Sequence, residues 1–487
     1  GFDGDVQRES QFQYAKLSYE LGYDREALIE LQNVKSGSPH FTEAQNLMSQ
    51  LLLKSGDYDK ALELMESLTN TTPKIQEAYQ QVSYLKGIQL YKDGQYGASE
   101  EFLLRSQTYQ LIPKTYALSF YYLGEIGYKL NEFQKSQNNF EQFNVRAKSV
   151  NNLPEEANTY TANYNIGYLQ LKQKSYALAA EYFTLSINEI NQNKPFINSS
   201  DIKNRLYPDA ILRAADCYFK DNRYDNAIRY YNRSIKNELP GQDYALFQKG
   251  RILGIQGKKQ EEINTFNTLA NKFPNSSYTD DGLYLLARAY YNNGERNSAL
   301  ASAQTLIDNH PNSQLKNQTH LLLGLMYYNE NEDQAALEEY VKVIRNNPTQ
   351  QESNSARTAV TEIYMDNNNP EGLIEFNKNI LGYDMTNYAK DSLLYRSAEI
   401  LYEQGDFVNA KNAYAKHIQQ FPESPLSIYS HYNKGECHLV SKEYRNALAE
   451  YDYVIQQGQS NLYENALTKA ANLSYNKFKN FSKAYTY

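Results

Sequence analysis

The sequence predicts an all-α protein built from about thirteen helix hairpins, the last of them incomplete. Three observations lead to this prediction. Apolar residues in 280–313 recur at helical spacing on both sides of a short turn. Small residues recur at two fixed places along nearly the whole chain, and prolines close several of the predicted hairpins. Hairpins of this size have apolar stripes too narrow for a core of their own, so they are stable only when stacked on one another.

The stretch 280–313 shows the predicted unit most clearly. Its first half, 283–291, has apolar residues three and four apart, which places them on one face of a helix. Asn292-Asn293-Gly294 predicts a turn, and a second helix follows over 298–307. His310-Pro311 is predicted to end that helix, because proline disfavours a helical residue before it and has no amide to donate.

Small residues mark the places where the two helices of each hairpin are predicted to cross. We call them the first-helix and the second-helix small position; the second follows the first by twelve residues. Only Val360, Asn472 and Glu262 are not Ala, Gly or Ser. The first-helix positions are Ala15, Ser49, Gly87, Gly124, Gly167, Ala215, Gly250, Ala287, Gly324, Val360, Ala398, Gly435 and Asn472. The second-helix positions are Ala27, Ala61, Ser99, Ser136, Ala179, Ala227, Glu262, Ala299, Ala336, Gly372, Ala410, Ala447 and Ala484.

Several stretches follow the pattern of the tetratricopeptide-repeat family, with Leu-Gly-x2-Tyr in the first helix and Ala-x3-Phe in the second. Leu323-Gly324-x2-Tyr327 matches the first part; Ala336-x3-Tyr340 and Ala410-x3-Tyr414 match the second, with tyrosine for phenylalanine. The chain departs from the family pattern in having no tryptophan. It resembles tetratricopeptide-repeat proteins over nearly its whole length, and the resemblance implies a right-handed α-solenoid.

One connection breaks the regular spacing. Ala179 and Ala227 are 48 residues apart, farther than any other neighbouring pair of second-helix small positions, and the surplus falls in 193–207. Either a longer second helix is followed by a surface loop, or a functional loop reaches a partner. We predict one array over 1–487, with sub-arrays 1–192 and 208–487 joined by the longer connection 193–207.

Three predicted hairpins share a joining phrase. It reads Phe273-Pro274-Asn275-Ser276, His310-Pro311-Asn312-Ser313 and Phe421-Pro422-Glu423-Ser424. Proline ends one helix, and serine is expected to cap the next. The phrase is similar to tetratricopeptide proteins of the bacterial cell envelope, such as the outer-membrane assembly lipoprotein and the Tol–Pal-associated periplasmic protein. This resemblance implies the periplasm or the periplasmic face of the outer membrane; the cytoplasm is the alternative.

Charge and hydropathy exclude some partners. A net charge of −8 argues against nucleic acid, which needs a basic stripe. No run approaches the roughly 20 apolar residues of a membrane span. No signal peptide is visible at the first residues. Because the last hairpin lacks most of its second helix and a polar cap, we expect the chain to belong to a longer protein.

The sequence predicts neither an enzyme nor a cofactor. It has no phosphate-binding glycine loop, no nucleophile elbow and no zinc-protease motif. His431 and His438, near Glu436, are the nearest approach to a metal site, but they share the predicted inward face, so packed histidines are the better interpretation. Cys217 and Cys437 are interpreted as small, half-buried residues; a disulfide would require distant repeats to meet.

The surface of the first helices carries the functional prediction. In the family these helices line a concave groove, chiefly through residues three before, one after and four after the first-helix small position. Tyrosine recurs at the outer two places, and the middle place alternates in charge. The tyrosines either fill space between repeats or form an aromatic groove for a peptide or helix, and both can hold at once.

We therefore expect a non-enzymatic scaffold that binds a protein or peptide in this groove, in cell-envelope assembly or secretion. Two alternatives stay open: a solenoid that binds carbohydrate or peptidoglycan, and a targeting arm of a larger protein whose catalytic domain lies elsewhere. The predicted contact residues are Tyr84, Tyr91, Tyr121, Glu125, Tyr128, Tyr164, Tyr168, Arg251, Tyr284, Arg288, Tyr291, Tyr328, Tyr395, Glu399, Tyr402 and Tyr432.

Overall fold

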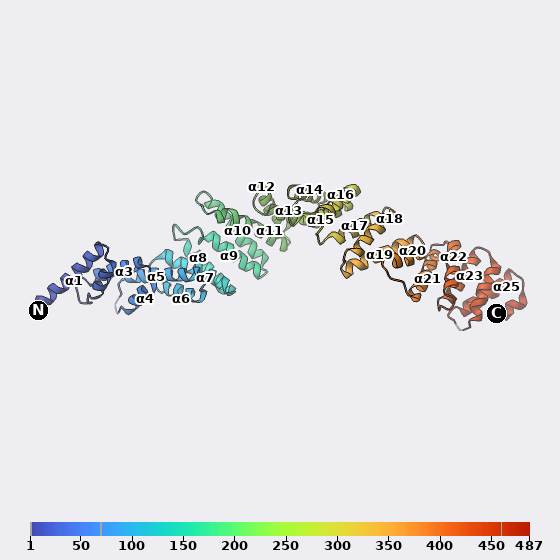
Figure 1. The fold of residues 1–487 in the computed structure, drawn as a ribbon, viewed down its shortest axis with the longest axis horizontal. Coiled ribbons are helices and arrows are strands. Elements are labelled where there is room, and N and C mark those ends of the chain that lie inside the picture. Colours follow the sequence, from blue (N-terminus) through green and yellow to red (C-terminus); the bar gives the residue numbers. More distant parts are fainter. Residues whose placement is uncertain (1, 69–70, 459) are drawn as a thin grey trace. The chain divides into compact units, whose positions relative to one another are not determined.

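The computed structural model describes residues 2–68, 71–458 and 460–487, with side chains from residue 4 onward. Within these residues all regular structure is helical (Figure 1). The chain forms two compact units, one ending at Thr279 and one beginning at Asp280. In each unit, consecutive helices joined by short turns pair in chain order. The predictions of an all-α fold and of hairpin stacking are confirmed within each unit.

The helices alternate between the first and the second member of a hairpin. The first unit contains α1 (Phe2–Glu20), α2 (Asp24–Gln32), α3 (Phe41–Ser55), α4 (Tyr58–Ser67), α5 (Pro73–Lys92), α6 (Tyr96–Ser106), α7 (Pro113–Lys129), α8 (Phe133–Ala147), α9 (Thr159–Lys172), α10 (Tyr176–Asn193), the π-helical turn η1 (Ile202–Leu206), α11 (Tyr207–Lys220), α12 (Tyr224–Lys236), α13 (Gln242–Ile255) and α14 (Lys259–Lys272). The second contains α15 (Thr279–Asn292, whose first residue closes the first unit), α16 (Arg296–Asn309), α17 (Lys316–Tyr328), α18 (Asp333–Arg345), α19 (Gln350–Asp366), α20 (Pro370–Ile380), α21 (Asn387–Glu403), α22 (Phe407–Gln420), α23 (Ser427–Val440), α24 (Tyr444–Gln456), α25 (Tyr463–Asn476) and α26 (Phe481–Thr486).

The turns within hairpins need a residue in the left-handed region. Gly294, between α15 and α16, has a φ of 80°, and Asn331, between α17 and α18, has a φ of 62°. Glycine and asparagine tolerate this conformation better than other residues, which is why they recur in these turns. The turn predicted at Asn292-Asn293-Gly294 is confirmed, and α16 ends where His310-Pro311 was expected to stop it.

Each hairpin is held together where its two helices cross. The first-helix small position faces the residue sixteen places later, on the second helix. A Cβ added to Gly124 would lie 2.8 Å from the ring of Phe140, and one added to Gly167 would lie equally close to Phe183. The residues in this second place are all buried: Leu31, Met65, Leu103, Phe140, Phe183, Tyr231, Phe266, Ala303, Tyr340, Phe376, Tyr414 and Tyr451. Large residues fit here because the opposite helix presents little or no side chain.

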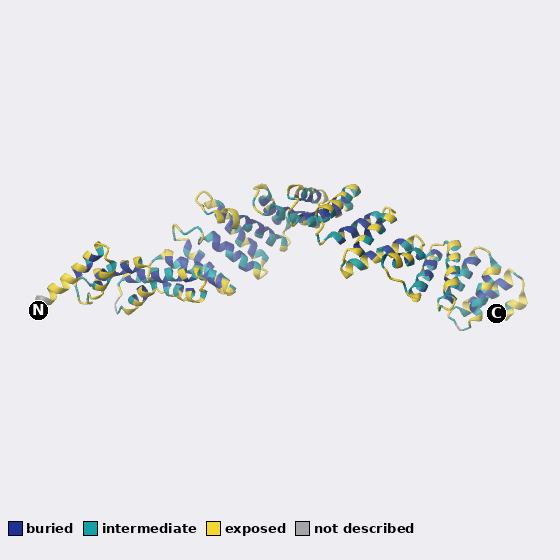
Figure 2. Ribbon diagram, viewed as in Figure 1, coloured by how far each residue is buried: buried dark blue, intermediate teal, exposed yellow. Residues whose placement is uncertain are grey.

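Serine at the second-helix small position adds a hydrogen bond to this crossing. The Ser99 hydroxyl donates to the Gly87 carbonyl at 2.7 Å, and the Ser136 hydroxyl donates to the Gly124 carbonyl at 2.6 Å. Both serines are fully buried, so these bonds satisfy groups that would otherwise be costly to bury. Figure 2 shows that buried residues lie between paired helices.

The three exceptions among the small positions differ from one another. Val360 is buried in its expected place. Glu262 fits because Gly254, on the facing helix, leaves room: a Cβ there would lie 2.6 Å from the Glu262 carboxylate. Asn472 is exposed, so the predicted register of the last hairpin is wrong. The buried residues of α25 are Ala466, Ala470, Leu473 and Ser474. The register shifts because the backbone hydrogen bonds of the connection to α26 differ from those of the other turns within hairpins.

The joining phrase links helices through a serine–aspartate hydrogen bond. Ser313 donates to Asp280 at 2.6 Å and Ser424 donates to Asp391 at 2.7 Å. Ser276 donates to Asp243 in the same way in the first unit. Each serine oxygen also accepts an amide two residues later. The serine thus ties the entry of the next helix to the start of its own hairpin, a larger role than the predicted cap.

Both cysteines are buried, and the two histidines considered as metal ligands, His431 and His438, pack against neighbouring side chains. Cys217 and Cys437 are buried free thiols rather than half-buried ones, and burial raises their pKa values to about 12 and about 11. His431 stacks on Tyr453 and pairs with Glu450 at 2.6 Å. The described residues include no cluster of three or more metal-ligating side chains. Among those residues, no helix combines the length and hydropathy needed to cross a bilayer.

Candidate functional site

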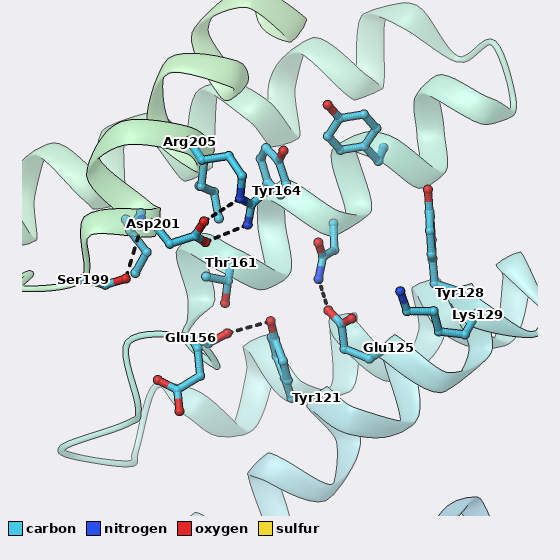
Figure 3. Close-up of a pocket in the computed structure, with 14 residues that line it drawn as sticks. Tyr121, Glu125, Tyr128, Lys129, Glu156, Thr161, Tyr164, Ser199, Asp201 and Arg205 are labelled. Atoms are coloured by element: carbon cyan, nitrogen blue, oxygen red, sulfur yellow. Dashed lines mark hydrogen bonds and ion pairs between the residues drawn. The ribbon is translucent and has the colours of Figure 1, made fainter. Parts of the chain in front are cut away.

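The first unit contains a pocket of about 510 Å³ between α7, α9 and the 193–207 connection (Figure 3). Five predicted contact residues line it, together with residues of the connection itself. The lining residues are Tyr121, Glu125, Tyr128, Lys129, Glu156, Thr161, Tyr164, Asn165, Tyr168, Ser199, Asp201, Ile202, Arg205 and Leu206. Two features that the sequence singled out separately, the tyrosine rows and the irregular connection, therefore meet at one place.

The connection is anchored rather than loose. Ile197, Ile202 and Leu206 are buried, because they pack into the core around α10 and α11. The Glu155 carboxylate accepts the backbone amides of Asn198 and Ser199 at 2.9 and 2.7 Å. These amide hydrogen bonds lower the pKa of Glu155. The connection thus combines a longer second helix, α10, with an ordered segment that forms one wall of the pocket.

The tyrosines of the pocket are held by their hydroxyl groups. Tyr164 donates to Asp209 Oδ2 at 2.7 Å, and Tyr168 donates to the same oxygen. Tyr121 donates to the Glu156 carbonyl at 2.8 Å. Burial raises the pKa of all three, so they are neutral hydrogen-bond donors near neutral pH. These hydrogen bonds restrict the orientation of the three side chains.

Two charged features flank these rings. On α7, the Glu125 carboxylate accepts hydrogen bonds from Asn165 and, at 3.3 Å, from Tyr91. Burial raises the pKa of Glu125. On the opposite wall, Arg205 and Asp201 form a two-pronged ion pair at 2.6 and 2.7 Å. The pocket therefore has a half-buried acidic group on one wall and a paired, exposed one on the other.

The tyrosine rows also have packing partners throughout the chain. The tyrosine three residues before the first-helix small position contacts the buried ring of the second helix. The ring centres of Tyr121 and Phe140 are 5.5 Å apart, and those of Tyr432 and Tyr451 are 5.8 Å apart. The ring four residues after the small position contacts the ring that begins the second helix, as Tyr402 does with Phe407 at 5.4 Å. These rings fill space within hairpins while most of them stay partly exposed.

The structure brings some predicted residues together and leaves others apart. Tyr91, Tyr121, Glu125, Tyr128, Tyr164 and Tyr168 belong to the pocket or its hydrogen-bond network, and Tyr84 packs beside them on Tyr122. Arg251 lies elsewhere in the first unit, with its guanidinium over Phe219 and Phe247. The remaining predicted residues belong to the second unit: Tyr284, Arg288, Tyr291, Tyr328, Tyr395, Glu399, Tyr402 and Tyr432.

The residues of the second unit make local contacts. The Arg288 guanidinium lies over the Tyr284 ring at 5.9 Å. Tyr328 donates to Asp366, and Asn329 donates to the Tyr291 hydroxyl. Sequence reasoning missed Asn165, Asp209 and the Asp201–Arg205 pair. Only the long 179–227 spacing drew attention to this part of the chain.

Comparisons with known families agree with this architecture. The tetratricopeptide-repeat profile matches residues 209–238 and 392–424, which cover most of the hairpins α11–α12 and α21–α22. The chain carries tetratricopeptide repeats. The profile described as an outer membrane lipoprotein matches residues 241–366, so the chain is similar to that family there. No curated protein matches the chain.

Solved tetratricopeptide-repeat structures resemble parts of the chain at low identity. YrrB, "a TPR protein with an unusual peptide-binding site", is 18% identical; the match covers 41% of this chain and 89% of YrrB, with a TM-score of 0.31. A C-terminal part of a repeat protein from Cytophaga hutchinsonii is 13% identical over 56% of this chain and 98% of its own, with a TM-score of 0.42. The type IV pilus biogenesis factor PilW is 17% identical over 48% and 95%, with a TM-score of 0.31.

Proposed function

We propose that the protein is a non-enzymatic scaffold that binds a segment of a partner protein at the pocket of the first unit and the tyrosine face around it. One observation carries the proposal: the 193–207 connection and five residues of the predicted first-helix face line the same pocket. Tetratricopeptide repeats typically serve as non-catalytic scaffolds, and stacked repeats present extended binding surfaces.

The chemistry of the pocket suits a peptide. Tyrosine offers a large amphipathic contact area with only two side-chain torsions to fix on binding. Here the hydroxyls of Tyr121, Tyr164 and Tyr168 are already hydrogen-bonded, so little further entropy is lost when a partner binds. A cavity of about 510 Å³ accommodates one or two side chains of a bound segment.

The profile match over 241–366 supports placing this scaffold in the bacterial envelope, in assembly or secretion. We propose the periplasm or the periplasmic face of the outer membrane as its location. Fractionation of cells that express the natural protein tests this, and recovery in the cytoplasmic fraction contradicts it.

Affinity capture with the full chain tests the binding site. Tyr128→Ala combined with Tyr168→Ala removes two rings from the pocket lining and should abolish capture of the specific partner. Tyr402→Ala is the matched control, because Tyr402 has the register of Tyr128 but belongs to the second unit. Circular dichroism confirms that the variants keep their helical content. Unchanged capture by the double variant, or competition by glycan fragments but not by partner peptides, contradicts the proposal.

A further inference from the structure

Four acidic residues occupy the same place in their hairpins, one residue after the first-helix small position. They are Glu125, Asp216, Glu399 and Glu436. Three of them have a basic partner: Arg213 lies 2.6 Å from Asp216, Arg396 lies 3.1 Å from Glu399, and Lys469 lies 2.8 Å from Glu436. In these hairpins the protein supplies its own counter-ion.

Glu125 is the exception. Within the part of the chain that the structure describes, no lysine or arginine nitrogen lies within ion-pair distance of its carboxylate. Its partners are the neutral donors Asn165 and Tyr91. Lys129, one turn later on α7, lines the same pocket, and its charge favours the ionised carboxylate less than burial opposes it. A half-buried carboxylate without an ion-pair partner is stabilised in its charged form by a nearby cation.

The empty space beside Glu125 is suited to a cation. The pocket that Glu125 lines is also lined by Tyr121, Tyr128, Tyr164 and Tyr168. Figure 3 shows the first three of these tyrosines, which come from α7 and α9. The hydroxyls of Tyr121, Tyr164 and Tyr168 donate to other groups, so they offer no further donor that would oppose a cation. Aromatic rings attract ammonium and guanidinium groups through their quadrupoles. On the far wall, Asp201 is already neutralised by Arg205.

We propose that this pocket receives a lysine or arginine side chain of the partner segment, with Glu125 as its counter-ion and the tyrosine rings around its aliphatic stem. The inference rests on the proposed function, since it names the side chain that the binding site selects. In this inference the partner supplies to Glu125 the positive charge that residues of this chain supply to Asp216, Glu399 and Glu436.

Short blocked peptides test the inference without knowledge of the partner. The probes are acetyl-Ala-Ala-Lys-Ala-Ala-amide and the same peptide with norleucine or glutamate in place of lysine. Ligand-observed saturation-transfer NMR with the full chain should show contact with the lysine methylenes, and little with the other two peptides. Equal binding of the lysine and norleucine peptides, or no binding of the lysine peptide at millimolar concentration, overturns the inference.

Two substitutions locate the site. Glu125→Gln should weaken binding of the lysine peptide by about tenfold or more, the range expected for loss of one charge-assisted interaction. Asn165→Lys should also block the site, because it supplies an internal cation from a residue that already contacts Glu125. Glu399→Gln is the matched control and should leave the affinity for the lysine peptide unchanged, because Glu399 is already paired with Arg396. Unaltered affinity in both pocket variants overturns the inference.

The same variants separate the inference from the proposed function. If the natural partner is no longer captured by the Tyr128→Ala, Tyr168→Ala chain but is still captured by Glu125→Gln, the scaffold proposal stands and the cation pocket is wrong. If capture survives in the tyrosine variant while Glu125→Gln weakens the lysine peptide, the pocket binds cations but is not the partner site.

Discussion

The hairpins α7–α8 and α21–α22 carry similar residues at several equivalent positions but differ in what surrounds them. Equivalent positions carry Gly124 and Ala398, Glu125 and Glu399, Tyr128 and Tyr402, and Phe140 and Tyr414. In α21, Arg396 neutralises Glu399, and Tyr395 donates to it as well. In α7 the corresponding glutamate has neutral partners and borders a pocket. The repeat register thus fixes the helix face on which a side chain lies, while the neighbouring residues determine whether its charge has an ion-pair partner.

The largest expected effect concerns the buried aromatic residue that both hairpins have at their helix crossing. Phe140→Ala and Tyr414→Ala should each lower the free energy of unfolding by about 4 kcal/mol, the usual cost of emptying a buried aromatic site. Both side chains are fully buried against the partner helix. Denaturant unfolding followed by hydrogen exchange localises the loss. A loss in only one of the two variants would show that the crossings are not equivalent.

The next prediction compares the first-helix small positions of the two hairpins, where their crossings differ. Gly124→Ala should destabilise α7–α8 by about 1–3 kcal/mol although alanine is the better helix former, because its Cβ would press on the Phe140 ring. Ala398→Gly should cost only about 1 kcal/mol, from helix propensity and lost contact. Thermal melting of both variants shows which substitution destabilises the protein more. A stabilised Gly124→Ala variant would mean that the ring moves freely.

A smaller effect tests a feature of the second unit that lies between hairpins. Ser424→Ala removes the hydroxyl that donates to Asp391 and should cost about 1 kcal/mol. Ser441→Ala, at an exposed serine, is the control. Amide exchange at the start of α23 should rise in the first variant alone, and an equal rise in both would contradict the role of the serine–aspartate bond.

The last prediction concerns the direction of pH dependence, which should differ between the two hairpins. Burial raises the folded-state pKa of Glu125 above its usual 4.5, so the protonated form favours folding and stability falls as pH rises from 4.5 through that pKa. Burial lowers the folded-state pKa of His417 below 6.5 despite its bond to Asp391, so stability falls as pH drops below 6.5.

Local hydrogen exchange, corrected for intrinsic rates, measures both slopes. Glu125→Gln should remove the first slope and His417→Gln the second, each without altering the other. The groups facing His417 are Asp391, Ser430, Tyr395 and Phe421, and the slope should survive substitution of Phe421 by leucine. Identical slopes in both hairpins would contradict this prediction.

The sequence by itself determined the repeat unit. Alternating helical stripes, turn residues and the spacing of Ala287 and Ala299 identified the hairpins, because a helix crossing requires a small residue at a fixed interval. The same register placed Tyr121 and Glu125 on the first-helix face. It failed at Asn472, where an altered turn shifts which face is buried. Periodicity reports the local helix, and it does not report how a turn closes.

Only the tertiary structure decided which of these residues form a site. Tyr164 and Tyr168 share the oxygen of Asp209, Glu155 fixes the amides of the 193–207 connection, and Asn165 reaches Glu125 from the next hairpin. These contacts join residues about 40 positions apart. No local pattern encodes them, because they depend on how neighbouring repeats stack and on where an irregular segment packs.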